Sequence, residues 1–193
     1  MHKELKLLFD EDQYECLNQP RDGTTEYLAL RKKCKFRISQ VNEILESNKD
    51  PSGDDYFHAC IIFMHGDCPD DFWQAYNLAL KAVDQNYKGA KRFAAAAFDK
   101  WLMYQGKPQK FGLQYVPDGV RLRIWDVDPE TTDKERKDWE VPTLEELFKN
   151  VRDLNERFDI SMISMETKPQ WLKDAIKRWN SEQTTDNVAN AQQ

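Results

Sequence analysis

The chain is poor in glycine, proline and histidine, which supply 7, 8 and 3 of its 193 residues. No apolar run approaches the ~18 residues that a membrane-spanning helix requires. The sequence contains no Gly-rich phosphate loop, no Gly-x-Ser-x-Gly motif and no His-Glu-x-x-His motif. These absences argue against a membrane protein, a P-loop protein, and the hydrolases and zinc proteases that such motifs mark.

Cysteine is also scarce, and none of the four cysteines is spaced as in a Cys-x-x-Cys zinc or redox motif: Cys16, Cys34, Cys60 and Cys68. The first residues lack the long apolar stretch of a secretory signal peptide. We therefore expect a soluble, reduced, cytoplasmic protein.

The formal net charge is -6 and the pI about 5.2, whereas a protein that binds a phosphate backbone needs a basic face. The only dense basic run, Arg31 to Lys35 followed by Arg37, falls in a predicted helix, and we interpret it as a solvated face. We expect neither a nucleic-acid partner nor a membrane partner. The oligomeric state is left open.

Apolar residues recur at helical spacing through most of the chain. The patterns predict helices near residues 30–47, 54–64, 68–83, 90–104, 143–158 and from 169, with a short charged helix or turn at 131–139. A single alternating segment around Pro117-Asp118-Gly119 predicts a β-hairpin near 114–125. The expected fold is mainly α: one helical, bundle-like domain over residues 1–180 with one hairpin. Residues 181–193 lack apolar periodicity, so we expect a disordered tail.

The Ala-rich helix at 90–104 is apolar on nearly every side, which is typical of a central, buried helix. Asp99 interrupts it, and a buried carboxylate needs a partner because burying a lone charge is costly. Arg92, Lys100 or a backbone group would satisfy it in a purely structural role. We favour a functional role instead.

A second candidate is the turn His65-Gly66-Asp67, where one predicted helix ends and another begins. Histidine titrates near neutral pH and suits general acid-base chemistry, and the glycine would let a ligand approach. The simpler interpretation makes His65 the C-cap of one helix and Asp67 the N-cap of the next. His58, seven residues before His65, would lie on the same side of its helix.

The loop after the Ala-rich helix offers neutral hydrogen-bonding groups at Gln109, Gln114 and Tyr115. With His58, we predict that they bind substrate; the alternative is an ordinary structured loop. No cofactor is expected. If a metal were bound, His65, Asp67 and Asp99 would be its ligands, although their spacing matches no established metal motif.

Several short motifs of these segments resemble an uncharacterised family of bacterial and fungal proteins that is classed only as a domain of unknown function. The similarity covers about residues 55–148. The matching positions are His65-Gly66, Ala95-Ala96-Ala97, Asp99, Gly106, Pro108-Gln109, Phe111-Gly112, Gln114 and Val141-Pro142-x-Leu144. This chain has Lys100 where the family often has Arg, and Leu113 where it often has Thr. The resemblance implies that His65, Asp99, Gln109 and Gln114 form one site, and it supplies no established reaction.

These observations favour a small, metal-independent enzyme that performs acid-base chemistry on a small polar organic substrate. His65 would be the catalytic acid or base, Asp99 would orient it, and Gln109 and Gln114 would hold a carbonyl oxygen. Hydrolysis, elimination and cyclisation all fit. The alternatives are a non-catalytic module that binds a small molecule or peptide, and a protein-interaction domain. We expect His65 and Asp99 to face one pocket, with the two glutamines in its wall.

Overall fold

The computed structural model describes the chain except residues 158, 161–162 and 191–193 and the side chains of residues 182–190. The described residues form eight helices and one two-stranded antiparallel hairpin, which confirms the mainly helical prediction. The elements are α1 (Lys3–Leu17), α2 (Thr25–Ser47), α3 (Gly53–Met64), α4 (Pro69–Asp84), α5 (Ala90–Tyr104), β1 (Tyr115–Pro117), β2 (Leu122–Ile124), α6 (Asp133–Asp138), α7 (Leu144–Asn155) and α8 (Gln170–Asn190).

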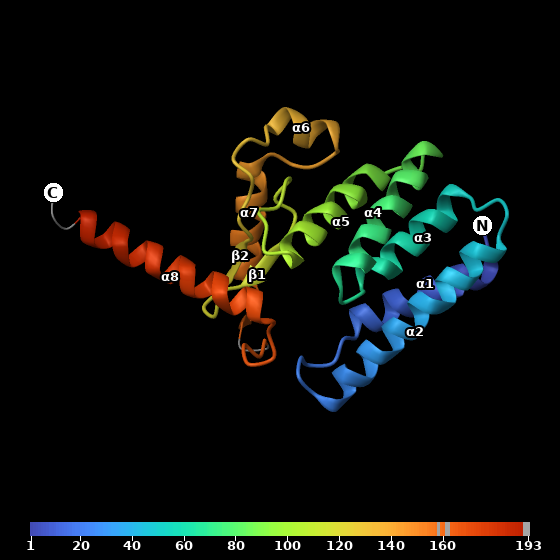
Figure 1. Ribbon diagram of the computed structural model, residues 1–193, viewed down its shortest axis with the longest axis horizontal. Coiled ribbons are helices and arrows are strands. Elements are labelled where there is room, and N and C mark those ends of the chain that lie inside the picture. The colour runs from blue at the N-terminus through green and yellow to red at the C-terminus, as the bar shows by residue number, and fades with distance from the viewer. Residues whose placement is uncertain (158, 161–162, 191–193) are drawn as a thin grey trace.

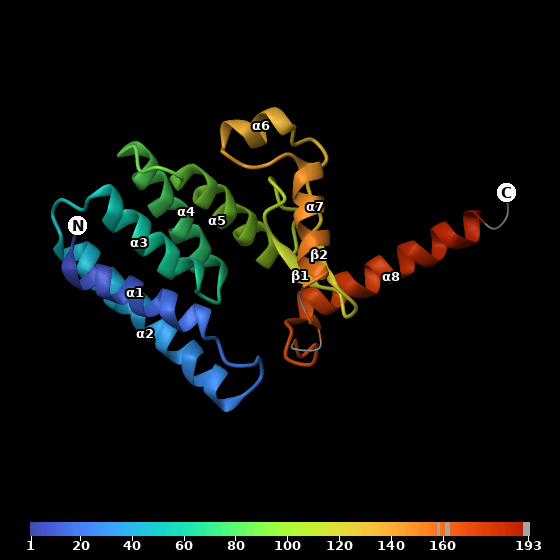
Figure 2. The ribbon, with the colours of Figure 1, turned by 180° about the vertical axis from the view of Figure 1, so that it is seen from behind.

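The helices are arranged in two groups, and α5 reaches from one to the other (Figures 1 and 2). Helices α1 and α2 run side by side and cover α3, while α4 packs between α3 and α5. The hairpin, α6, α7 and the start of α8 gather around the C-terminal end of α5 and the loop that follows it. Helix α8 then projects away from the rest, so its far end and the N-terminus lie at opposite ends of the molecule.

Among the described residues, helix α5 contributes to each of three apolar clusters. Ala94 and Ala97 pack with α1–α4, Ala95 packs with the hairpin and α7, and Met103 packs with α8. Because alanine is small, these helices approach α5 closely on several sides. The prediction of a central, buried Ala-rich helix is confirmed.

Side-chain caps define several helix starts. Capping boxes open α3, α6 and α7, the last being the Thr143–Glu146 box that its sequence predicts. The start of α4 differs from the prediction, because its N-cap is Cys68 and not Asp67. Asp67 pairs with Lys35 Nζ at 3.0 Å, while the Asp71 carboxylate accepts a hydrogen bond from the Asp67 N–H.

The hairpin pairs Tyr115 with Ile124 and Pro117 with Leu122, within the predicted range. Helix α7 attaches to it through Asn155, whose carboxamide contacts both backbone polar groups of one residue, Leu122. Its Oδ1 accepts from the Leu122 N–H and its Nδ2 donates to the Leu122 carbonyl, each at 2.8 Å. The amide side chain therefore makes the two hydrogen bonds that a neighbouring third strand would make with Leu122.

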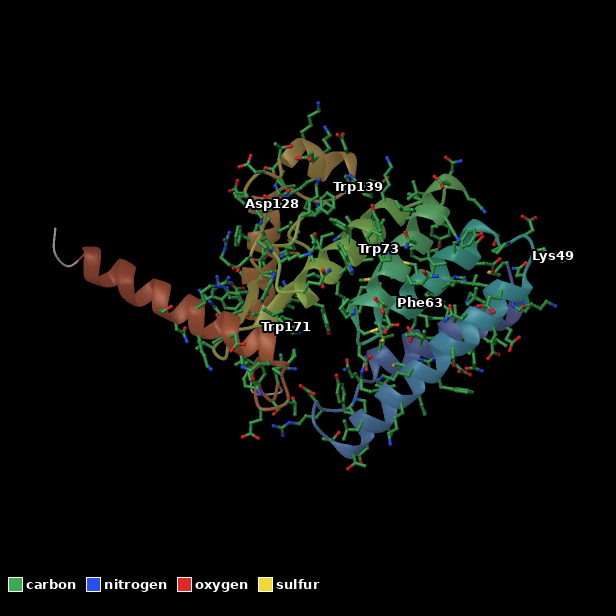
Figure 3. All side chains as sticks on the ribbon, viewed as in Figure 1. Lys49, Phe63, Trp73, Asp128, Trp139 and Trp171 are labelled. Atoms are coloured by element: carbon green, nitrogen blue, oxygen red, sulfur yellow. The ribbon has the colours of Figure 1, made fainter. Side chains whose placement is uncertain are left out.

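Helix α8 begins against the hairpin, where Trp171 lies edge-on to Trp125 with ring centroids 5.3 Å apart (Figure 3). Trp179 is buried and donates to Asp126 Oδ1 at 2.8 Å. The helix continues to Asn190, so it overlaps the tail for which we predicted disorder; residues 191–193 lie outside the described part of the chain. Within the described residues, no helix has the length and apolar character needed to cross a membrane.

Replacing Asn155 with Ala should lower the free energy of unfolding by about 1–3 kcal/mol, because it leaves the Leu122 N–H and carbonyl without their partner. Chemical denaturation of the variant and the wild type measures the difference. Asn150→Ala, an exposed position on the same helix, is the matched control. Equal losses in the two variants would show that the carboxamide contact contributes nothing specific.

Candidate functional site

The His65 turn is held by cations from two other helices. His65 is the C-cap of α3, where the last carbonyls of a helix lack intrahelical partners. Lys100 Nζ of α5 donates to the Met64 carbonyl at 2.7 Å, and Arg31 of α2 donates to the carbonyls of His65 at 2.8 Å and Gly66 at 3.0 Å. Positive charge at a helix C-terminus is favourable, so these contacts fix the position of His65.

Glycine at position 66 is required by packing. A Cβ atom there would lie 2.4 Å from the Asp71 Cβ and Oδ2 atoms, which is far inside any normal contact. The Asp71 carboxylate occupies that space while it accepts from the Asp67 N–H. The glycine therefore makes room for a neighbouring side chain and not, as its sequence position suggests, for a ligand.

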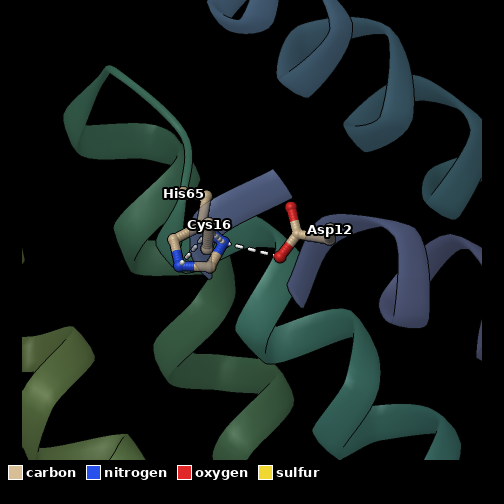
Figure 4. Close-up of side chains that lie close together, drawn as sticks. All are labelled: Asp12, Cys16 and His65. Atoms are coloured by element: carbon tan, nitrogen blue, oxygen red, sulfur yellow. Dashed lines mark hydrogen bonds and ion pairs between the residues drawn. The ribbon is translucent and has the colours of Figure 1, made fainter. Parts of the chain in front are cut away.

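The carboxylate that contacts His65 comes from α1 (Figure 4). Asp12 Oδ2 lies 2.6 Å from His65 Nδ1, and the two side chains are 1% and 30% exposed. Arg37 of α2, itself buried, donates to Asp12 Oδ1 at 2.9 Å and to Glu15 Oε2 at 2.6 Å. A carboxylate paired with arginine accepts hydrogen bonds and cannot donate them, so Nδ1 of His65 carries the proton. In the neutral imidazole, Nε2 is then the nitrogen that can accept a proton.

Cys16 lies one helical turn after Asp12 and next to the same ring. Its Sγ is 3.4 Å from Nδ1 and 3.6 Å from Nε2 of His65. Because these two distances are nearly equal, the sulfur is not directed at the lone pair of either ring nitrogen. Burial, together with the charge of the nearby Asp12, raises the pKa of Cys16 to about 11. The thiol is therefore protonated at neutral pH, unlike an activated cysteine nucleophile.

These groups line one cavity of about 350 Å³, which we call the His65 pocket. Its walls come from α1, α2, α5 and the His65 turn, and they include Asp12, Cys16, Tyr27, Arg31, His65, Lys100 and Tyr104. Burial, reinforced by the charge of Arg31, lowers the pKa of Lys100 to about 8. A lysine whose pKa is lowered this far, and which lines a cavity, is more typical of a functional site than of a structural contact.

A second cavity, which we call the Tyr115 pocket, has a volume of about 440 Å³ and shares part of this wall. Tyr27, Lys100 and Tyr104 line both cavities. The remaining walls of the Tyr115 pocket come from the α1–α2 loop, α2, α5, the hairpin with the loop before it, and the segment that leads into α8. Lys100 therefore lies where the two pockets meet.

Asp99 has a different set of partners from the one that we predicted. It is 0% exposed, and it accepts hydrogen bonds from the backbone N–H groups of Lys110, Phe111 and Leu113 at 2.8, 2.8 and 2.9 Å. Gly112, with φ of +96°, lets the loop wrap around the carboxylate. The structure thus pairs Asp99 with the loop and His65 with Asp12, and it does not pair the two predicted catalytic residues with each other.

The predicted substrate-binding residues are also divided. Gln114 and Tyr115 line the Tyr115 pocket. Gln109 is fully buried, where it donates to the carbonyls of Gln114 and Trp125 and accepts from the Gln114 N–H. His58 is buried and stacks on Phe9 with ring centroids 4.3 Å apart, and burial lowers its pKa. Gln109 and His58 therefore belong to the fold and not to a pocket wall.

Sequence reasoning missed Asp12, Cys16 and Arg37, and it assigned the wrong role to the arginines of the basic run. Lys32, Lys33 and Lys35 are exposed as predicted, whereas Arg37 is buried and Arg31 contacts the His65 turn. The one available signal was the spacing of Asp12 and Cys16, which places both on one face of a helix.

The described residues contain two groups of potential metal ligands, and within each group the ligand atoms lie within 4.8 Å of one another. The groups are Asp12, Cys16 and His65, and Asp67, Cys68 and Asp71. The ligand set that the sequence suggested, His65 with Asp67 and Asp99, is not among them. Asp67 pairs with Lys35, and Asp99 is surrounded by backbone N–H groups.

A scan against protein-family models, a search of curated proteins and a search of solved structures each found no match to this chain. The resemblance over residues 55–148 therefore stays a prediction. What the site can do must be argued from its geometry.

The tautomer of His65 should follow Asp12 and not Asp99. In Asp12→Asn, the amide oxygen must face Arg37, which can only donate, so the amide NH₂ faces His65 and the proton moves from Nδ1 to Nε2. Long-range ¹⁵N–¹H NMR correlations of the neutral imidazole report this change. Asp99→Asn, the control, should leave the Nδ1–H form in place. A tautomer change in Asp99→Asn but not in Asp12→Asn would contradict the assignment.

Burial raises the pKa of Asp99 from 3.8 to about 6, although its backbone N–H partners act in the opposite direction. The folded protein therefore binds this proton more readily than the unfolded chain does, and the resulting stability is lost as the pH rises through about 6. From pH 7 to pH 5, the wild type should gain about 1 kcal/mol of unfolding free energy relative to Asp99→Asn. Urea denaturation at both pH values measures this; a relative loss would show that the N–H groups dominate.

Proposed function

We propose that this protein is an enzyme in which His65 performs general acid-base chemistry on a small polar organic molecule bound in the His65 pocket. The observation that carries the proposal is the 2.6 Å contact between His65 Nδ1 and the buried Asp12 carboxylate. A buried acid that fixes the tautomer and orientation of a partly exposed imidazole is the arrangement that makes histidine an effective base.

In this role Nε2 accepts a proton from the substrate or from a water molecule, and the imidazolium that forms is stabilised by Asp12. Arg37 holds the other oxygen of that carboxylate and keeps it oriented toward His65. The same proton later returns to the leaving group or product. Hydrolysis, elimination and cyclisation share this step, and each remains compatible with the site.

Lys100 supplies the positive charge that such reactions require. It lines the pocket with His65, and its Nζ uses one hydrogen-bond donor on the Met64 carbonyl. With a pKa of about 8 it is mostly protonated at neutral pH, and it would attract the carboxylate or developing oxyanion of a substrate. Lys100 would therefore hold the substrate oxygen, a role that the sequence analysis gave to Gln109 and Gln114.

A binding module without turnover is the second candidate, and one observation favours it. Arg37 is paired with the Asp12 carboxylate, and Arg31 and Lys100 donate to backbone carbonyls, so the pocket is a preformed polar surface. Such a surface can hold a ligand without any chemical step. Turnover that depends on His65 distinguishes the two.

The test is an assay of the wild type against a panel of small esters, amides, lactones and β-substituted acids. For a compound that is turned over, His65→Gln should lower kcat/KM by about 10²–10⁴-fold, the usual contribution of a general base. His2→Asn is the matched control, because His2 caps α1 far along the chain and asparagine retains a cap acceptor. A compound that shifts the NMR signals of pocket residues, yet is never converted, would establish the binding module instead.

A further inference from the structure

We propose that Asp12 Oδ2, Cys16 Sγ and His65 Nδ1 form a site for a divalent transition metal ion of the zinc type, with the remaining coordination position open to the His65 pocket. The three ligand atoms lie within 4.8 Å of one another. They combine one carboxylate oxygen, one sulfur and one imidazole nitrogen, all of which are established zinc ligands.

The Sγ–Nδ1 distance suits a tetrahedral ion. With bonds of ~2.0 Å to nitrogen and ~2.3 Å to sulfur, tetrahedral geometry places those two atoms ~3.5 Å apart. Sγ and Nδ1 are already separated by 3.4 Å, but Sγ also lies 3.6 Å from Nε2, so the imidazole ring must turn to direct the Nδ1 lone pair at an ion that Sγ shares. The 2.6 Å between Oδ2 and Nδ1 is a hydrogen bond, which must open by ~0.7 Å to admit the ion.

The backbone supports this set. Asp12 and Cys16 occupy positions i and i+4 of α1, so their side chains leave the same face of one helix. His65 approaches from a separate element, the end of α3, which Lys100 and Arg31 hold in place. Two ligands one turn apart on a helix, with a third from elsewhere, is a recurring plan of zinc sites.

The surrounding charges are consistent with a dication. Arg37 binds Asp12 Oδ1 and thereby leaves Oδ2 directed at the site, as outer groups do for metal-binding carboxylates. Glu15 accepts from the same guanidinium and offsets its charge. On binding, the ion replaces the Cys16 thiol proton, which passes to solvent, while the ring proton of His65 moves from Nδ1 to Nε2 and the imidazole stays neutral. The Asp12 carboxylate and the Cys16 thiolate then neutralise the ion.

The other ligand group, Asp67, Cys68 and Asp71, is the weaker candidate. It has no imidazole, and its two carboxylates are already engaged with Lys35 and with the Asp67 N–H. Nitrogen and sulfur ligands favour zinc-type ions over the hard cations that carboxylates select. This group therefore serves as the internal comparison.

The metal site goes beyond the proposed function and does not depend on it. An ion at Nδ1 removes the proton that Asp12 orients, so the metal-bound protein lacks the acid-base pair. We therefore expect Zn²⁺ to inhibit any reaction that His65 catalyses. Failure of metal binding would leave the acid-base proposal intact, because the contact between Asp12 and His65 exists without an ion.

Titration of the reduced, metal-free, full-length protein with Co²⁺ tests the site through its absorption. A cobalt–thiolate bond gives a near-ultraviolet charge-transfer band, and tetrahedral cobalt gives intense visible bands. We expect both to saturate at a single equivalent and to disappear when Zn²⁺ is added. Cys16→Ser should abolish the charge-transfer band, and Cys68→Ser, the matched control, should retain it.

His65→Gln provides an independent check, because it should weaken Co²⁺ binding at least tenfold while the Cys16 thiol remains present. Circular dichroism confirms that each variant is folded. The proposal is overturned if the wild type shows no charge-transfer band. It is equally overturned if the band survives Cys16→Ser, or is lost in Cys68→Ser, since the ion would then bind at the other group.

Discussion

The buried carboxylate of Asp12 joins three separate parts of the chain. It extends from α1, pairs with Arg37 on α2 and contacts His65 at the end of α3. An ionised group in this environment costs several kcal/mol unless both of its oxygens are satisfied, so each partner restricts where the other can lie. The packing of α1 and α2 on α3 and the geometry of the candidate site are therefore consequences of the same contact.

Two of the buried acids, Asp12 and Asp99, differ in the nature of their partners. Asp99 is surrounded by backbone N–H groups that belong to one loop, and it therefore shapes that loop and the hairpin beyond it. Asp12 is surrounded by side chains that carry or accept protons. Asp12 also lies in the wall of the His65 pocket, so a ligand bound there can reach these side chains. Chemistry is accordingly expected beside Asp12, in the first group of helices.

Local patterns were sufficient to predict most of the fold. Periodicity identified α5 as the central helix, and the sequence Thr143-Leu-Glu-Glu146 identified the start of α7. The need of Asp99 for a partner also followed from its apolar surroundings, although the partner itself did not. The site was harder to predict because Asp12 meets a residue 53 positions away and another 25 positions away. No local pattern encodes which helices pack together, so the basic run on α2 gave no sign that Arg37 points inward.

Asn155 has a consequence for how copies of this protein behave toward one another. A two-stranded sheet exposes unpaired N–H and carbonyl groups along its outer edges, and these can recruit strands from other molecules. Here the backbone N–H and carbonyl of Leu122 are bound by the Asn155 side chain of α7. The residue that pairs with Leu122 in β1 is Pro117, which has no backbone N–H. The hairpin is thus protected at this point on both strands against edge-to-edge aggregation. That protection comes from one amide and one imino acid, with no further strand.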